Sequence, residues 1–330
     1  MDDTNSQAFQ DRTYISSDGL TLHLRDYDPD SEATEGRLPV ICLPGLTRNS
    51  RDFHHLALIL SRDPVVSRRV IALDYRGRGL SDWDENKANY NLAVEARDVT
   101  EACAYLNIGR AAFIGTSRGG LILHLLAGIN PDLMDAVVLN DIGPVIEAGG
   151  LMKIRDDLNG ARLPRDMEDT AALLKLRQGA DFAALSDPDW VEMATAIYRD
   201  IDGELLPDVD PAIAQQLLSI DFTKPMPDLW AQYESFGKLP LMVIRGENSA
   251  LLTENTLTAM AERHSDLKIV RVPGQGHPPL LHLEPALREH PDYSCGNLVR
   301  RSLGGQPLQS MLSHCQEYKK PGSFEPGFPD

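Results

Sequence analysis

The stretch AFIGTSRGG, residues 112–120, decides how the rest of this chain can be interpreted. A short apolar run ends at Gly115, and a helix-like segment that is apolar nearly all round begins at Arg118. Between them lies the pattern G-x-S-x-G, which in a strand–turn–helix context holds a serine hydroxyl above a parallel sheet. The start of a helix also favours a developing negative charge. We therefore predict that Ser117 is a nucleophile, rather than a serine that only caps the helix.

Strand-like and helix-like segments alternate along most of the chain. An opening hairpin is expected over Thr13–Ser16 and Leu20–Tyr27. Further apolar, strand-like runs lie at 38–45, 69–79, 111–115, 135–141, 239–246 and 267–274. Helical spacing of apolar residues marks Asn91–Leu106, and a second helix is expected over about Thr253–His264. The alternation predicts an α/β fold, with a mostly parallel sheet and helices on both faces.

The alternation of strand-like and helix-like segments is interrupted over residues 145–238, which lack strand-like runs. The helix-like pieces of this segment lie at Asp169–Arg177, Asp189–Asp200 and Asp210–Leu218. We expect a helical cap inserted into an α/β core that comprises residues 1–144 and 239–288. Residues 289–330 lack periodicity, and His290-Pro291 should stop the helix-like segment before them, so an irregular C-terminal tail is expected.

Composition and charge limit the classes of molecule that this chain is expected to bind. The chain has 330 residues, a net charge of −17 and a pI near 4.9. Such a negative field repels phosphate backbones and anionic lipid, so nucleic acid and membrane surfaces are not expected partners. The acidic, polar N-terminus predicts no secretory leader, and no apolar run in the sequence approaches the length of a membrane span. Four scattered cysteines without metal-binding spacing indicate isolated thiols in a reducing cytoplasm.

A serine nucleophile needs a base, and one histidine is well placed for that role. His277 lies in PGQGHPPLL, residues 273–281, a glycine-rich loop directly after the last strand-like run. The chain order is serine and then histidine, as in hydrolases with a nucleophile elbow. His124, in contrast, falls inside a helix and is expected to be satisfied in the core. We predict that His277 accepts the proton of Ser117.

A tetrahedral intermediate of acyl transfer needs N–H donors for its oxyanion. One donor is expected from the backbone of Arg118, the residue after the nucleophile. The second is expected from Leu46 in LPGLTRN, residues 43–49, where Gly45 lets the backbone approach closely.

Together these motifs resemble the α/β-hydrolase fold superfamily. The matching stretches are LPGLTRNSRDF (43–53), ALDYRGRGLSDW (72–83), GTSRGG (115–120), VVLNDIGPV (137–145), VIRGENSALL (243–252) and VPGQGHPPLL (272–281). The similarity covers roughly residues 12 to 285 and is closest to the bacterial group of meta-cleavage C–C hydrolases, esterases and enol-lactonases. The resemblance implies an eight-stranded, mostly parallel sheet, a helical cap inserted after the sixth strand, and no cofactor.

The chain departs from the family pattern at the acid that orients the histidine. Close relatives have an aspartate where this chain has Ala250, and the commoner spacing falls on Ser249. Loss of that acid in a serine hydrolase lowers turnover by about 10⁴. Two substitute acids are open: Glu247 on the same loop, and Asp141 after the sixth strand, beside Asn140 at the aligned position. Asn140 could also hold the ring by a hydrogen bond. If none of these residues acts, the chain is a hydrolase with a vacant acid slot that is weakly active or serves as a binding protein, or a hydrolase whose sequence has been altered.

The sequence thus predicts a serine hydrolase that acts on a small carboxylic ester or lactone through an acyl-enzyme. A C–C bond hydrolase of the diketo-acid type and a catalytically impaired ligand-binding protein are the alternatives, and perhydrolysis would use the same catalytic groups. Arg48, Arg78 and Arg118 are candidates for contacting an anionic substrate, or else are simply solvated. The oligomeric state, including a homo-oligomer, is left open.

Overall fold

The computed structural model describes residues 8–27, 34–63, 66–159, 162–222, 224 and 226–283. The expected C-terminal tail at 289–330 and the last part of the expected core, 284–288, lie outside these residues, as do Cys295 and Cys315. Within the described ranges, no helix is both long enough and apolar enough to cross a membrane.

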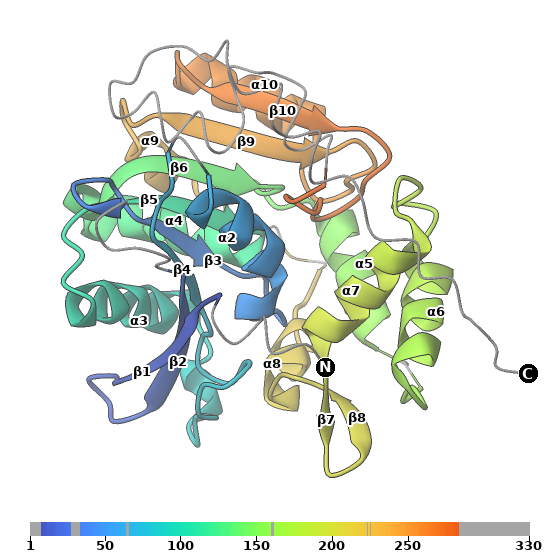
Figure 1. Ribbon diagram of the computed structural model, residues 1–330. Helices are drawn as coiled ribbons and strands as arrows, with labels where there is room; N and C mark the ends of the chain where they lie inside the picture. Colours follow the sequence, from blue (N-terminus) through green and yellow to red (C-terminus); the bar gives the residue numbers. More distant parts are fainter. Residues whose placement is uncertain are drawn as a thin grey trace, which may run out of the picture.

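An eight-stranded sheet forms the centre of the molecule (Figure 1). Its strands are β1 (Gln10–Ile15), β2 (Thr21–Tyr27), β3 (Val40–Leu43), β4 (Val70–Leu73), β5 (Ala111–Thr116), β6 (Met134–Asn140), β9 (Leu241–Gly246) and β10 (Lys268–Val272). Their spatial order is β1-β2-β4-β3-β5-β6-β9-β10. β2 pairs antiparallel with β1 and with β4, and all other neighbours in this sheet are parallel. The predicted α/β class and the opening hairpin are confirmed.

Alternate residues of the central strands face the two sides of the sheet. In β3, Ile41 and Leu43 belong to one core cluster, whereas Val40 and Cys42 belong to the other. Both sets are buried because helices cover both faces, and this explains why the central strands appear in the sequence as continuous apolar runs.

The helices of the core divide between the two faces of the sheet. They are α2 (His54–Ser61), α3 (Leu92–Tyr105), α4 (Arg118–Ile129) and α10 (Glu254–Arg263), with the short 3₁₀ helices η1 (Ser50–Phe53), η2 (Lys87–Asn89) and η3 (Pro131–Leu133). Apolar residues of α3, α4 and α10 join the cluster on one face, and those of α2 join the cluster on the other. The turns and loops at the carboxyl ends of the parallel strands carry the site described below.

The elements between β6 and β9 lie in the segment expected to form the cap, here called the insert (residues 145–238). They are α5 (Ala148–Leu158), α6 (Met167–Gln178), α7 (Asp187–Ile197), β7 (Tyr198–Ile201), β8 (Glu204–Pro207), α8 (Pro211–Leu218) and α9 (Trp230–Glu234). Figure 1 shows α5, α6 and α7 beyond the carboxyl ends of the parallel strands. The expectation that this segment lacks strands is wrong: β7 and β8 form an antiparallel hairpin around Asp202 and Gly203, whose φ angles are 55° and 86°.

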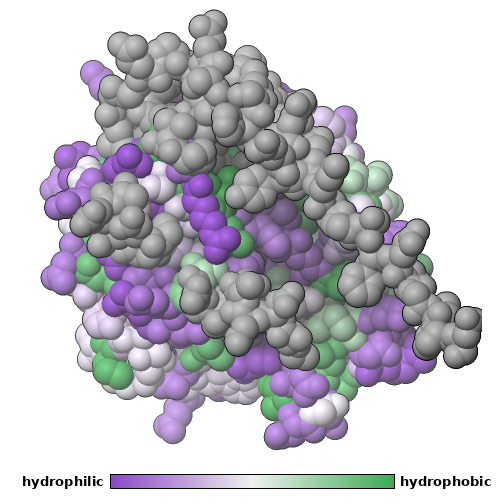
Figure 2. Space-filling model, in the orientation of Figure 1, coloured by the Kyte–Doolittle hydropathy of each residue, from purple (hydrophilic) through white to green (hydrophobic). Residues whose placement is uncertain are grey.

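The surface drawn in Figure 2 mixes hydrophilic and hydrophobic residues without a single dominant patch. Exposed large apolar side chains of the insert are Met152, Leu163, Leu176, Val191 and Ile201. Scattered apolar side chains are ordinary on protein surfaces, so these residues do not by themselves mark a binding site.

Candidate active site

Three side chains that are far apart in the sequence meet at the carboxyl edge of the sheet. Ser117 follows β5, Asp141 follows β6, and His277 lies in the loop after β10. His277 Nε2 lies 2.9 Å from Ser117 Oγ, and His277 Nδ1 lies 2.6 Å from Asp141 Oδ2. The imidazole therefore joins the serine hydroxyl and the carboxylate in one hydrogen-bonded chain. In such a chain the ring can take the serine proton while the carboxylate orients the ring.

The backbone around Ser117 explains the glycine pattern of this turn. Ser117 has a φ of 51° and a ψ of −110°, a strained conformation of the kind found at functional sites. A Cβ added to Gly119 would lie 2.2 Å from the carbonyl oxygen of Leu43, and one added to Gly115 would lie 2.6 Å from the nitrogen of Gly120. The glycines thus allow β5, β3 and α4 to pack closely, with Ser117 partly exposed at the turn.

Asp141 is fully buried and is held by donors from two loops. Its φ is 55°, and its backbone N–H donates to the carbonyl oxygen of Ile244 at 2.7 Å. Its Oδ1 accepts from the N–H of Gly246 at 2.9 Å, and its Oδ2 accepts from the hydroxyl of Ser249 at 2.5 Å as well as facing His277. A buried carboxylate needs donors of this kind to stay charged. These contacts fix the carboxylate where it can orient the ring.

The other acid positions raised by the sequence lie elsewhere on these loops. Glu247 Oε2 accepts from the N–H of Gly274 at 2.7 Å, so this carboxylate braces the turn before the histidine loop. Asn140 donates to the carbonyl oxygen of Pro279 at 3.1 Å, which ties β6 to the same loop. Ala250 is exposed and has no group that can pair with an imidazole. Of the two substitute acids, the structure brings one to the ring and uses the other as a loop brace.

Two backbone N–H groups border the nucleophile. The N–H groups of Leu46 and Arg118 have no acceptor among the described residues. Arg118 is the first residue of α4, where helical N–H groups lack intrahelical partners. Gly45 lies against the serine, since a Cβ there would be 4.0 Å from Ser117 Cβ. The two N–H groups expected to bind the oxyanion are therefore unpaired within the described ranges, one in the loop after β3 and one at the start of α4.

The three arginines considered for substrate binding are all engaged with carboxylates. Arg48 Nε lies 2.7 Å from Asp52 Oδ2. Arg78 and Arg118 both donate to Glu95, at 2.8 Å and 2.6 Å. Arg78 is fully buried, so its side chain is neither solvated nor placed to contact a substrate directly.

Sequence reasoning did not single out Glu95, and it did not foresee the contact that Ser249 makes. Glu95 lies at helical spacing from Leu92 and Val99, on the apolar face of α3. A charged residue on such a face needs a buried partner. A glutamate on the apolar face of the expected helix was therefore the sequence signal that could have identified Glu95. No comparable signal marks Ser249, because its bond to Asp141 depends on how two loops meet.

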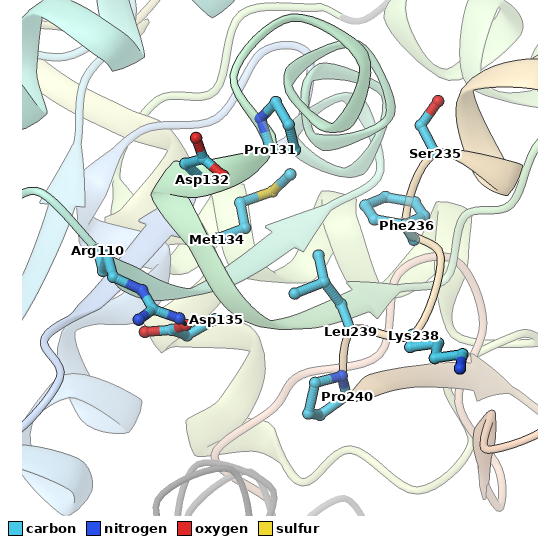
Figure 3. A pocket seen from close by; sticks show the side chains of 10 residues that line it. All are labelled: Arg110, Pro131, Asp132, Met134, Asp135, Ser235, Phe236, Lys238, Leu239 and Pro240. Carbon is cyan, nitrogen blue, oxygen red and sulfur yellow. Dashed lines mark hydrogen bonds and ion pairs between the residues drawn. The ribbon is translucent and has the colours of Figure 1, made fainter.

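A separate cavity of about 760 Å³ opens at the opposite edge of the sheet (Figure 3). Its lining includes the ion-paired Arg110 and Asp135, together with Phe236 and Lys238. These residues lie near the amino ends of β5, β6 and β9, whereas Ser117 follows the carboxyl end of its strand. Ligands of open α/β sheets bind at the carboxyl ends, so we do not assign this cavity to catalysis.

Other residues with potential chemistry lie in the core. His124 Nδ1 lies 2.7 Å from the carbonyl oxygen of Gly120, and burial lowers the pKa of this histidine to about 4. Cys42 and Cys103 are buried, and neither forms a disulfide within the described residues. Across the part of the chain that the structure describes, no group of His, Cys, Asp and Glu side chains is arranged to hold a metal ion.

The parallel sheet and the serine turn at its carboxyl edge define a hydrolase of the nucleophile-elbow class. Residues 39–282 match the family described as the alpha/beta hydrolase fold, and the chain belongs to this family. The superfamily predicted from the motifs is confirmed.

Similar proteins are also named as hydrolases. The 3-hydroxybutyrate-oligomer hydrolase of Cupriavidus necator is 30% identical over 270 residues, 78% of this chain and 88% of that protein. The 2-(acetamidomethylene)succinate hydrolase of Mesorhizobium japonicum is 32% identical over 238 residues, 71% of this chain and 79% of that protein. A solved alpha/beta hydrolase from Novosphingobium aromaticivorans is 34% identical, with a TM-score of 0.78 over 89% of this chain and 99% of that chain.

Proposed function

We propose that this chain hydrolyses a small carboxylic ester or lactone with Ser117 as the nucleophile. The observation that carries the proposal is the hydrogen-bonded chain from Ser117 through His277 to Asp141. His277 removes the serine proton as the serine oxygen attacks the ester carbonyl. Asp141 holds the proton on Nδ1, which fixes the ring tautomer and stabilises the imidazolium as it forms.

The remaining steps use the same groups. The attacked carbonyl oxygen becomes negative and accepts from the N–H groups of Leu46 and Arg118. His277 then donates its proton to the leaving alcohol, and the acyl group stays on Ser117. Water that is deprotonated by His277 attacks this acyl-enzyme, which releases the acid and restores the serine. A lactone follows the same course, except that its leaving hydroxyl stays attached to the acyl group.

We further propose that the insert covers the site as a cap and selects the substrate. Asn49 Nδ2 and Arg51 Nη2 donate to the carbonyl oxygen of Ala196 in the insert, at 3.1 Å and 3.0 Å. Arg51 also pairs with Asp208 of the insert at 2.6 Å. Because Asn49 and Arg51 follow Leu46 closely in the chain, the end of α7 lies beside the proposed oxyanion loop. Side chains of the insert would then limit which acyl and alcohol groups fit.

The relatives support two substrate classes for this machinery. One relative is named for oligomers of 3-hydroxybutyrate, in which hydroxy-acid units are joined by ester bonds. We propose short hydroxy-acid esters as the preferred substrates, because the similarity to this relative covers more of both chains. The second relative is named for 2-(acetamidomethylene)succinate and favours an acidic, non-ester substrate as the alternative.

The test of the catalytic proposal compares the unchanged protein with Ser117→Ala on p-nitrophenyl butyrate. We expect saturable hydrolysis, with kcat lowered by more than about 10⁴ in Ser117→Ala. A fluorophosphonate should attach to Ser117, as read by mass spectrometry of the labelled peptide. Hydrolysis that survives in Ser117→Ala would refute the proposal. Butyrate binding with neither hydrolysis nor labelling would favour a non-catalytic binding protein.

The substrate proposal needs its own comparison. We would measure kcat/KM for a 3-hydroxybutyrate dimer, for 2-(acetamidomethylene)succinate and for a meta-cleavage diketo acid. The dimer should be hydrolysed with the highest kcat/KM. A higher value for either of the other compounds would assign the chain to that chemistry while leaving the catalytic groups unchanged.

A further inference from the structure

Glu95 is a fully buried carboxylate that takes no direct part in the proposed reaction. It lies in the first turn of α3. Its Oε1 accepts from Arg78 Nη1 at 2.8 Å, and its Oε2 accepts from Arg118 Nε at 2.6 Å. Burial alone raises the pKa of Glu95, but the two guanidinium charges outweigh burial and lower it. Glu95 is therefore a charged bridge between two arginines.

Each arginine leads to one of the residues proposed to bind the oxyanion. Arg118 carries one donor N–H on its own backbone. Arg78 Nε donates to the carbonyl oxygen of Leu46 at 2.9 Å, and Leu46 carries the other donor N–H. One carboxylate on α3 thus ties together the loop after β3 and the start of α4, the two segments that form the proposed oxyanion hole.

The two guanidinium groups depend on this carboxylate to stay together. Burial lowers the pKa of Arg78, Glu95 opposes that shift, and the nearby charge of Arg118 adds to it. The two cations therefore repel each other in an interior where charges are weakly screened. Neither arginine has a second carboxylate partner in the described part of the chain. Without Glu95, repulsion would separate the arginines and draw Leu46 away from Arg118.

We propose that Glu95 is a positioning residue for the oxyanion hole. Through Arg78 and Arg118 it holds the N–H groups of Leu46 and Arg118 so that both converge on the reacting carbonyl oxygen. The inference rests on the proposed ester hydrolysis. An oxyanion hole that has moved apart binds the tetrahedral intermediate less tightly and leaves binding of the unreacted substrate little changed.

The first variant is Glu95→Gln, which keeps the size of the side chain and removes its charge. On p-nitrophenyl butyrate we expect kcat to fall by about tenfold or more with KM little changed, since loss of a whole oxyanion donor costs about 10²–10³. A trifluoromethyl ketone forms a tetrahedral oxyanion on the serine, and its affinity should fall by a similar factor. The affinity for butyrate, which forms no such adduct, should stay the same.

Asp98→Asn is the matched control on the same helix. Asp98 is also buried, and it accepts from Arg76 Nε and Nη2, each at 2.7 Å. Each variant removes one member of a buried charge pair, so both should unfold at a lower temperature. Weakened ketone binding confined to Glu95→Gln supports the proposal. Equal losses of kcat and ketone affinity in both variants, or no loss in Glu95→Gln, would overturn it.

Two further measurements separate the remaining outcomes. Ser117→Ala reports whether hydrolysis depends on the serine, and an unchanged protein without serine-dependent hydrolysis would overturn the proposed function together with this inference. If Glu95→Gln does not fold, Arg118→Met replaces it, because that variant breaks the bridge on one side and keeps the backbone N–H. Because Arg118→Met removes the repelling charge together with the bond to Glu95, we expect a smaller but still selective loss of kcat and ketone affinity, and unchanged values would overturn the role of Glu95.

Discussion

Ser249 and Asp141 lie on different loops, yet the serine hydroxyl donates to the carboxylate that faces His277. Ser249 occupies the position where the commoner spacing of the family's motif would place the acid. In this chain that position supplies a hydroxyl donor, and the acid, Asp141, follows another strand. An aspartate at 249 would place two carboxylates against each other, and such pairs resist double ionisation. A serine at 249 and an aspartate at 141 are therefore a consistent combination.

The role of Asp141 gives the first prediction at the residue scale. Asp141→Asn should lower kcat by about 10⁴, because an amide favours the wrong ring tautomer and cannot stabilise the imidazolium. Glu247→Gln is the matched control, since Glu247 braces Gly274 and should affect kcat far less. Steady-state hydrolysis of p-nitrophenyl butyrate measures both. A larger loss in Glu247→Gln than in Asp141→Asn would mean that the acid has been assigned to the wrong residue.

The neighbouring loop gives a second prediction. Ser249→Ala should lower kcat by about 10- to 100-fold, because a hydrogen bond to a charged group contributes about 1.5–3 kcal/mol. Ala250→Asp should leave kcat unchanged, because Asp141 already pairs with the histidine and Ala250 is exposed. The same ester assay compares the two variants. A clear gain of activity in Ala250→Asp would show that position 250 is a vacant acid slot.

The sequence predicts the site unevenly, and the reason is physical. Ser117 and His277 sit in local patterns, a strand–turn–helix and a glycine-rich loop after a strand, and each pattern limits what its residue can do. The acid has no such pattern. Asp141 and Glu247 both follow strands that end at the same edge, and only the directions of their side chains separate them. Those directions depend on contacts between loops that are distant in the sequence.

At the element scale, most boundaries follow from local signals. The side chain of Asn91 accepts from two N–H groups at the start of α3, and Thr253 caps α10 in a similar way. The hairpin of β7 and β8 was missed, although an Asp-Gly pair at 202–203 is a typical two-residue hairpin turn. Its strands are short and partly exposed, so they lack the apolar alternation that identifies the strands of the core.

The packing of α4 gives a prediction with an internal control. A Cβ at Gly119 would meet the carbonyl oxygen of Leu43 at 2.2 Å, so Gly119→Ala should lower the free energy of unfolding by about 1–3 kcal/mol. It should also lower kcat, because Leu43 leads into the oxyanion loop. Gly128 lies on the same helix with nothing within 4 Å of an added Cβ, and Gly128→Ala should stabilise the protein by about 0.5–1 kcal/mol.

Urea unfolding and ester hydrolysis of the two alanine variants provide the measurement. Opposite changes in stability are expected from the same substitution on one helix. If Gly119→Ala is as stable as Gly128→Ala, α4 has room to shift and the glycine pattern does not arise from close packing.

At the scale of the whole molecule, the order of the strands and the position of the site follow from the α/β pattern. The hydrogen bonds and ion pairs between the insert and the core do not follow from that pattern. Arg51 reaches the carbonyl oxygen of Ala196, which lies 145 positions further along the chain. No pattern in the sequence around either residue predicts this hydrogen bond. Contacts of this kind become visible only when the fold has brought the segments together.

A buried histidine joins β1, β2 and the end of β4 and should make stability depend on pH. His23 Nδ1 lies 2.8 Å from Asp74 Oδ2, and its Nε2 lies 2.9 Å from Asp11 Oδ1. Burial alone lowers the pKa of His23, but the two carboxylates outweigh burial and raise it above its ordinary value of 6.5. The protonated ring therefore stabilises the fold fully below about pH 6.5, and this contribution is lost as the pH rises through the raised pKa.

His23→Gln should lower the free energy of unfolding by about 2 kcal/mol near pH 6, because a bridge to two charged groups is lost. The loss should be smaller near pH 9, since a neutral ring donates to only one of the two carboxylates. Burial raises the pKa of Asp74, but the bond to His23, the charge of His23 and the backbone N–H groups of Leu80 and Ser50 together outweigh burial and lower it, so Asp74 stays charged over this range. Urea unfolding at a series of pH values measures the difference between the two proteins. A difference that grows towards high pH would mean that the folded state holds His23 neutral.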